Sequence, residues 1–198
     1  MADPGLPSDF APPACSLADI ERMLTATPAI VWGELQGMPE PLRRWRPAAG
    51  EWCALEVVGH LTEADLRAFL GRIVLLRDEP GAAFAPWDPD LVAASRRDGA
   101  KDAQQVVDEF AKVRAVGVGV VRGLSPADLA RSGRHPDIGE LSVGNLLAEW
   151  VAHDRAHLAQ LGQITRAAML AGMGNARRFG HAEETRTWLD GREKNRSS

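Results

Sequence analysis

Two histidines, His153 and His157, stand four residues apart toward the C-terminal end of the chain. Residues at this spacing lie on one face of an α-helix, one turn from each other. On a helical wheel both histidines and Asp154 fall within the stripe formed by the apolar residues Val143, Leu146, Leu147, Trp150, Leu161 and Ile164. A buried imidazole carries a polar nitrogen that needs a partner. We therefore expect either a divalent metal ion or hydrogen bonds within the core to satisfy these nitrogens.

A third histidine, His60, lies on a second predicted helix, whose apolar side is made of Leu55, Val58, Leu66, Phe69, Ile73 and Leu76. His60 falls away from the centre of that side, in a narrow polar strip with Glu56, Glu63 and Arg67. For the carboxylates and the arginine, a solvated helix face is the alternative interpretation. Three imidazoles suit zinc, nickel or another borderline divalent ion. Three protein ligands leave coordination positions open, which is typical of a catalytic metal site.

The elements that must bring these histidines together are four helices, predicted from apolar residues at helical spacing over residues 16–37, 52–77, 103–124 and 142–168. Ser16 and Ser142 are the predicted N-caps of the first and the last. No alternating strand pattern competes with these periods. The sequence therefore predicts an all-α fold, an up-down four-helix bundle. The bundle spans residues 16–170, after a Pro-rich lead-in over 1–15 and before a C-terminal extension over 171–198.

Proline and glycine mark the predicted connections, over residues 38–51, 78–100 and 131–141. The longest is 78–100, and loops of this length often cover a pocket or form an interface. We expect Phe84 and Trp87 to hold it against the body of the protein. His135 precedes a proline and is expected in a loop, apart from the metal ligands. His181 stands in a charged segment and is expected to be solvated.

Composition excludes several classes of protein. The 198 residues carry a net charge of −4 with acidic and basic residues interspersed, so nucleic acid is not an expected partner. No apolar run approaches the length of a membrane span, and no signal peptide is recognisable, so the expected location is cytoplasmic. The two cysteines, Cys15 and Cys53, suggest neither a disulfide framework nor a cysteine-based zinc site.

Several motifs, in order along residues 16–168, resemble those of the DinB-like (YfiT-like) family: Glu51-Trp52, Glu56-Val57-Val58-Gly59-His60-Leu61 and His153-Asp154-x-x-His157-Leu158-x-Gln160. The connecting motifs Trp45-Arg46-Pro47 and His135-Pro136-x-x-Gly139 also match. The resemblance implies a four-helix bundle that is often a homodimer. It further implies a divalent metal ion, zinc or nickel, held by His60, His153 and His157. Cys53 departs from the family, which usually has Ser or Thr there, and it is either inert or a reactive thiol at a helix N-terminus.

Because some members of that family resemble thiol S-transferases, the resemblance favours a metal-dependent transferase that conjugates a small-molecule thiol to an electrophilic substrate. In that reading Glu63 or Glu56 moves a proton and Arg67 holds a carboxylate. Asp154 either orients a ligand histidine or holds the neighbouring helix. Metal-assisted hydrolysis would use the same three ligands. The other class of function is a non-catalytic, stress-related binding protein with a vestigial metal site. An open metal site beside a cleft lined by residues 78–100 would favour an enzyme.

Overall fold

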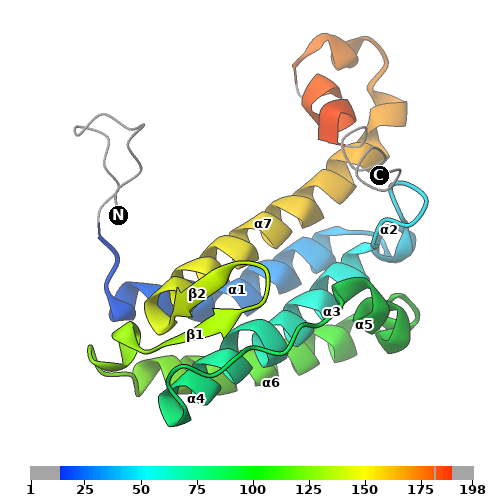
Figure 1. Cartoon of the computed structure of the whole chain (residues 1–198). Helices are drawn as coiled ribbons and strands as arrows, with labels where there is room; N and C mark the ends of the chain where they lie inside the picture. The colour runs from blue at the N-terminus through cyan, green and yellow to red at the C-terminus, as the bar shows by residue number, and fades with distance from the viewer. Residues whose placement is uncertain (1–13, 181, 189–198) are drawn as a thin grey trace.

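The computed structural model describes residues 14–180 and 182–188, and its body is a bundle of four helical rods (Figure 1). The first, third and fourth rods are α1 (Leu17–Gly37), α6 (Ala103–Arg122) and α7 (Val143–Met169). The second rod is made of three consecutive segments: α3 (Ala54–Ala64), the π-helix η2 (Asp65–Leu70) and α4 (Gly71–Asp78). The predicted four-helix bundle is confirmed.

The predicted N-caps are present at two of the rods. The backbone N–H of Asp19 donates to Ser16 Oγ at 3.2 Å, and that of Ser16 donates to Asp19 Oδ2 at 3.0 Å. Ser142 and Asn145 make the same reciprocal pair at the start of α7. Each pair satisfies two backbone donors that a helix start otherwise leaves unpaired, which fixes where α1 and α7 begin.

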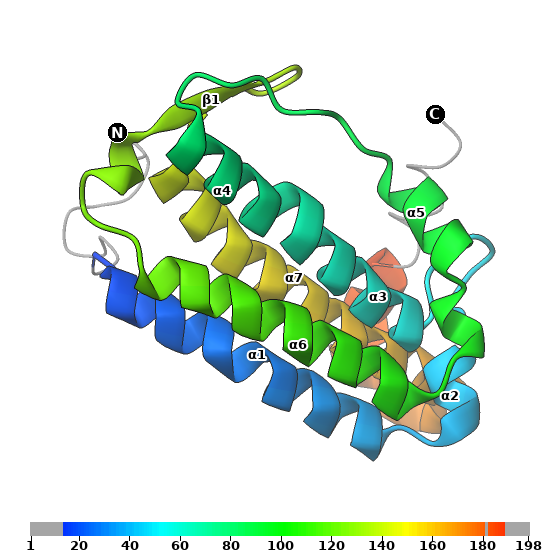
Figure 2. The ribbon, with the colours of Figure 1, turned by 90° about the horizontal axis from the view of Figure 1, so that it is seen from below.

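The connections depart from the predicted up-down order, in which successive helices would alternate in direction. Gly99, just before α6, lies beside Cys53 and Glu56 at the start of α3, so α6 begins at the same end of the bundle as α3. At its other end, Arg122 of α6 donates to Glu21 near the start of α1. The rods α3–α4 and α6 therefore run in the same direction (Figure 2), because the chain between them crosses back along the bundle.

All three predicted loops contain regular structure. The segment 78–100 holds α5 (Pro89–Arg96) and the short helix η3 (Asp98–Ala100), and 38–51 holds α2 (Glu40–Arg44). The prediction of no strand was wrong, because β1 (Ser132–His135) and β2 (Gly139–Ser142) form an antiparallel hairpin. Four-residue strands leave too short a pattern for period-two alternation to register. A short 3-10 turn, η4 (Asp128–Ala130), precedes the hairpin.

The second rod is covered on its outer side as well as its inner side. All residues of α3 are buried, since α5 and η3 pack over the side that faces away from the bundle core. Gly59 permits this close packing, because a Cβ at this position would lie 1.8 Å from Asp98 Oδ2. The solvated-face interpretation of Glu56 and Glu63 was therefore wrong.

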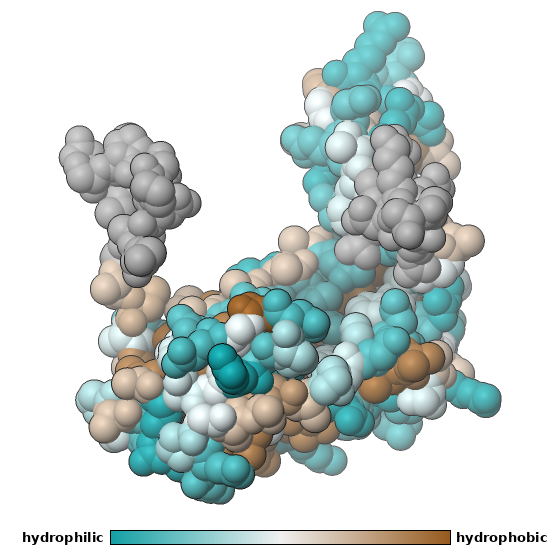
Figure 3. Space-filling model, viewed as in Figure 1, coloured by the Kyte–Doolittle hydropathy of each residue, from teal (hydrophilic) through white to brown (hydrophobic). Residues whose placement is uncertain are grey.

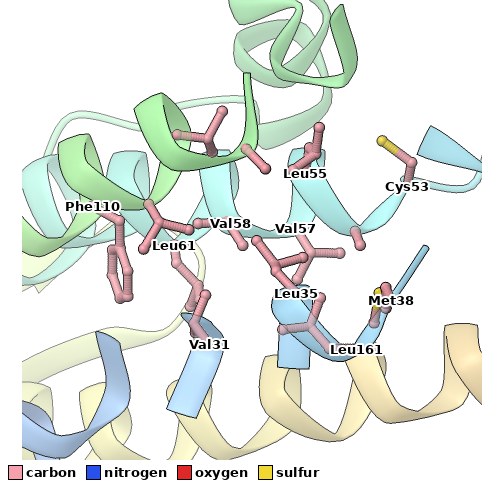
Figure 4. Packing of buried hydrophobic residues seen from close by; sticks show 14 of the residues in the cluster. Val31, Leu35, Met38, Cys53, Leu55, Val57, Val58, Leu61, Phe110 and Leu161 are labelled. Carbon is pink, nitrogen blue, oxygen red and sulfur yellow. The ribbon is translucent and has the colours of Figure 1, made fainter. Parts of the chain in front are cut away.

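The hydrophobic core runs along the whole bundle in two clusters. One gathers around Val31, Leu35, Val58, Phe110 and Leu161, as Figure 4 shows in part. The other lies toward the starts of α1 and α7 and centres on Trp150, a fully buried side chain.

The π-helix η2 changes the register of the second rod. Leu66, predicted on its apolar side, is 43% exposed, whereas Phe69 and Ile73 are buried as predicted. A π-helical turn holds more residues than an α-helical turn, so a wheel with a constant angle misplaces side chains within it. Such turns are frequent at functional sites.

The chain beyond α7 projects from the end of the bundle (Figure 1) as the short helix η5 (Leu170–Arg178) and a helical turn over 182–188. Its surface is largely hydrophilic, in contrast to the mixed face of the bundle (Figure 3). Residues 1–13 of the predicted lead-in, His181 and residues 189–198 lie outside the described part of the chain. Within the described part, no helix combines the length and the apolar character needed to cross a membrane.

Candidate metal centre

The three predicted histidines meet between α3 and α7. His60 comes from α3, and His153 and His157 come from successive turns of α7. One possible ligand atom of each residue lies within 4.8 Å of those of the other two. Nε2 of His60 and Nε2 of His153 are 3.0 Å apart. Ligand nitrogens about 2.1 Å from a zinc ion lie roughly 3 to 3.5 Å from one another, so this spacing needs little adjustment to hold a metal.

The two close imidazoles are not satisfied by the protein alone. If one Nε2 carries the proton and donates to the other, the accepting ring must be protonated on Nδ1. Yet Nδ1 of His60 and Nδ1 of His153 are both buried with no hydrogen-bond partner among the described residues. The close approach of the two Nε2 atoms requires either a proton shared between them or an ion that both coordinate. With His157 beside them, three imidazoles form a donor set that suits a divalent ion.

Burial also sets the protonation state of these histidines. Desolvation, together with the neighbouring imidazoles, lowers the pKa of His60 to about 3. Desolvation likewise lowers the pKa of His153 to about 4. Both rings are therefore neutral at physiological pH, which is the form that coordinates a metal ion.

His157 has a polar neighbour that orients its ring. Nδ1 of His157 lies 2.8 Å from Oε1 of Gln160, three residues further along α7. A hydrogen bond at one ring nitrogen fixes the tautomer and presents the other nitrogen for coordination. Gln160 thus holds the His157 ring in one orientation.

Aromatic side chains enclose the histidines. The Trp52 ring centroid lies 4.7 Å from that of His60, and Trp87 stacks on the same imidazole at 6.0 Å. Phe69, from the π-helix, meets His153 edge-on at 5.3 Å. Phe84 packs in the core as predicted, whereas Trp87 packs against the core and also faces the histidines.

A cavity of about 600 Å³ opens beside the histidines and has His153 in its wall. Its lining is mostly apolar and includes Trp87, from the segment 78–100, and residues of the β-hairpin. Three polar side chains join His153 in the wall: Arg72, Asn145 and Glu149. None of these three residues was predicted from the sequence as part of the site. The spacing of Glu149, four residues before His153, was the signal that could have placed it on the ligand face of α7.

Asp154 lies in the core but does not contact a ligand histidine. Its Oδ1 and Oδ2 accept hydrogen bonds from Arg114 of α6 at 2.8 and 2.5 Å, and Oδ2 also accepts from Thr27 of α1 at 2.7 Å. Two roles were expected for Asp154, and the structure shows the second of them: it holds neighbouring helices together.

The same arginine binds a second carboxylate. Nε and Nη2 of Arg114 donate to Asp65 at 2.7 and 2.8 Å, and Trp150 Nε1 donates to Asp65 at 2.6 Å. Arg114, Asp65 and Asp154 are each 1% exposed. These three residues, with Trp150 and Thr27, form what we call the buried ionic network. The apolar period of α6 gave no sign that an arginine would stand in the core.

Glu63 and Arg67 lie apart from the cavity beside His153. Glu63 accepts from Arg67 at 2.7 Å and from Arg96 of α5 at 2.7 Å, and these arginines lower its pKa despite its burial. Glu56 pairs with Arg46 and accepts from the backbone of Cys53. These ion pairs hold α5 and the preceding loop against α3, so the structure gives Glu63, Glu56 and Arg67 a place in packing and none in the cavity wall.

Cys53 is buried at the start of α3, and desolvation raises the pKa of its thiol to about 11. A thiol in this state is inert at neutral pH, which favours the first of the two readings of Cys53. His135 ends β1 and accepts from the backbone N–H of Asp137 at 3.2 Å, away from the three ligands as expected.

Comparisons with known proteins identify the family of the chain. The model of the DinB superfamily matches residues 23–161, which include all three histidines. OB0782 of Oceanobacillus iheyensis, provisionally named a metal-dependent hydrolase, is 24% identical over 60% of this chain and 67% of its own. The uncharacterized protein YuaE of Bacillus subtilis is 26% identical over 67% of this chain and 89% of its own.

Among solved structures, YfiT from Bacillus subtilis superposes with a TM-score of 0.71, at 20% identity, over 79% of this chain and 92% of that one. It is described as a probable metal-dependent hydrolase with an unusual four-helix bundle topology. That likeness concerns the fold, whereas the family match covers most of the chain. The chain with the His60, His153 and His157 centre belongs to the DinB superfamily.

Proposed function

We propose that this protein is a divalent-metal-dependent enzyme that acts on a small, largely apolar molecule, and that it transfers a low-molecular-weight thiol to an electrophilic carbon. The proposal rests on one observation: His153, one of the three possible metal ligands, also lines a mostly apolar cavity of about 600 Å³. Cavities of 300 to 1,000 Å³ with a few polar groups are typical of small-molecule sites. A purely structural metal site would need no such space.

His60, His153 and His157 would hold the ion, with Gln160 fixing the orientation of His157. A bound divalent ion lowers the pKa of a thiol or water ligand and so favours the nucleophilic form. In the proposed reaction the thiol sulfur forms a bond to the electrophilic carbon, the leaving group departs with the electron pair of the broken bond, and the thiol proton is released. Glu149 is the carboxylate in the cavity wall that we assign to accept this proton.

The aromatic side chains would serve the substrate. Trp87 and Phe69 present apolar faces to the cavity beside His153, and Trp52 closes the other side of His60. They exclude water from the neighbourhood of the reacting atoms, which strengthens electrostatic interactions there.

Metal-assisted hydrolysis is the second candidate, because OB0782 and YfiT are described as hydrolases of that kind. It would use the same ligands, with water in place of the thiol. Glu149 would then accept a proton from water.

The two reactions can be separated with one set of samples. Protein loaded with zinc, nickel or manganese, and the same protein after chelation, would be incubated with monochlorobimane and cysteine, glutathione, bacillithiol or mycothiol. In parallel, nitrophenyl esters and anilides would be offered without thiol. We expect metal-dependent formation of the bimane conjugate, reduced by roughly 10²-fold or more in Glu149→Gln. Metal-dependent ester or anilide cleavage without conjugate would favour hydrolysis, and activity in neither assay would contradict the proposal.

A further inference from the structure

Arg72 has no carboxylate partner in the described part of the chain, unlike Arg67 and Arg77 of the same helical rod. It lies on α4 and stands in the wall of the same cavity as His153. Its guanidinium carbon lies 5.0 Å from the centroid of the Phe84 ring. Among residues 14–180 and 182–188, no carboxylate lies within 4.0 Å of its guanidinium nitrogens.

Three nearby arginines each have a carboxylate partner. Arg67, one turn earlier, binds Glu63 at 2.7 Å, and Arg77, on the same helix as Arg72, lies 3.4 Å from Asp78. Arg131, which precedes the β-hairpin, binds Asp128 at 3.1 Å. Arg67 was the sequence candidate for holding a carboxylate, but Glu63 already occupies it.

The surroundings of Arg72 raise the free energy of a positive charge that has no partner. Its side chain is half-buried with the guanidinium over Phe84, and desolvation lowers the pKa of the guanidinium. An arginine nevertheless keeps its charge at any physiological pH. A half-buried charge without an anion is the arrangement that a planar anion such as a carboxylate can complete with two parallel hydrogen bonds.

The rest of the cavity wall sets what else the ligand must carry. Ala64, Ala68 and Phe69 contribute apolar surface, and the two alanines leave room in the wall. Glu149 lies one helical turn from His153, whereas Arg72 is the only cationic side chain among the described residues that line the cavity. A molecule with an apolar body and one carboxylate would therefore place its carboxylate at Arg72 and its other end toward the histidines.

We propose that Arg72 is the anion-binding residue of this cavity, and that the substrate or the thiol is an amphipathic carboxylate held by it. The assignment of the bound molecule as a reactant rests on the proposed function. The carboxylate preference itself does not, because it can be measured by binding alone. Arg72 positions the molecule and takes no part in bond making.

The test uses two probes that differ only in charge, 4-phenylbutyrate and 4-phenylbutyramide. Each is titrated by calorimetry into the full chain, in zinc-loaded and in metal-free form, since the carboxylate could also bind the ion. The variants are Arg72→Met, which keeps the aliphatic stem on Phe84, and Arg72→Lys, which keeps the charge. Arg77→Met is the matched control, because Arg77 lies on the same helix and outside the cavity wall. Thermal unfolding and zinc content are recorded for every sample.

We expect the wild-type protein and Arg77→Met to bind the carboxylate about tenfold or more tightly than the amide in both metal states, the gain typical of a charge-assisted hydrogen-bonded pair. Arg72→Met should lose this preference while amide affinity stays unchanged, and Arg72→Lys should retain part of it. Failure of the wild type to prefer the carboxylate, or a full preference in folded Arg72→Met, would overturn the assignment. A protein that takes up no zinc but keeps the Arg72-dependent preference would instead refute the proposed function and leave Arg72 as the anion site.

Discussion

His153 and Asp154 are neighbours on α7, yet they belong to two polar groups of opposite character. Asp154 belongs to the buried ionic network, in which Arg114 donates to two carboxylates and Trp150 and Thr27 add further donors. His153 belongs to the histidine centre, in which the Nδ1 atoms of two rings have no partner among the described residues.

The two groups differ in whether their polar atoms have partners within the protein. Every charge of the buried ionic network is paired within the protein, so none of its groups needs a ligand. The network joins α1, the second rod, α6 and α7, and its role is structural. The histidine centre has three possible ligand atoms within 4.8 Å of one another, pKa values that keep two rings neutral, and a cavity beside it. Potential metal ligands beside a cavity are the arrangement in which a small molecule can reach a bound ion.

The largest expected effect comes from breaking the buried ionic network. Arg114→Met leaves Asp65 and Asp154 buried without their cation and should lower the free energy of unfolding by roughly 3 to 5 kcal/mol. Chemical denaturation measures this loss. Arg122→Met is the control, because its ion pair with Glu21 is exposed and should be worth no more than about 1 kcal/mol. A loss from Arg114→Met as small as that of the control would contradict the structural role of the network.

The metal-free histidine centre should make stability depend on pH. The pKa of His60 is lowered to about 3 and that of His153 to about 4, whereas an unfolded chain holds histidine near 6.5. Between these values the unfolded chain binds more protons, so the free energy of unfolding falls as pH decreases from about 6.5 toward 4. The loss should be on the order of 3 kcal/mol for His60 alone.

Denaturation of the chelated protein across this pH range measures the effect. The same titration of His60→Leu should show a shallower fall, because the leucine binds no proton in either state. Equal slopes in the two proteins would mean that His60 is not buried in its neutral form.

A smaller effect is expected at the edge of the histidine centre. Gln160→Met removes the partner of His157 Nδ1 and should weaken zinc binding by roughly tenfold, with little change in the folded structure. Competition with a chromogenic chelator measures the affinity. Gln163→Met is the matched control on the same helix, because Gln163 Oε1 has no hydrogen-bond partner in the described structure. Equal affinities in the two variants would remove Gln160 from the site.

The sequence predicted the parts that depend on local periodicity and capping. Ser16 and Ser142 start helices as expected, and the four-residue spacing of His153 and His157 places both rings on the inner face of α7. Their meeting with His60 was implied by the family resemblance and is present in the structure.

What the sequence could not give depends on contacts between distant segments. Arg114 appears as a charged residue in an apolar period, and only the arrival of Asp65 and Asp154 from two other helices makes it a core residue. Likewise, Glu63 pairs with Arg96 only because α5 packs against the second rod. The π-helix sets the direction in which Arg67 and Arg72 leave this rod, and only Arg67 reaches a carboxylate. These contacts determine which polar residues line the cavity. Glu149 and Arg72 line it, whereas the residues predicted from the sequence, Glu63 and Arg67, do not.

The central claim is that His60, His153 and His157 hold one divalent ion. Mass spectrometry of the metal content, on protein purified without a histidine tag and after incubation with zinc, nickel or manganese, tests it most directly. We predict near-stoichiometric metal in the wild type and in His135→Ala, whose histidine lies apart from the centre, and its loss in His60→Ala, His153→Ala and His157→Ala. A wild-type protein that takes up none of the three metals, or triad variants that keep them, would contradict the claim.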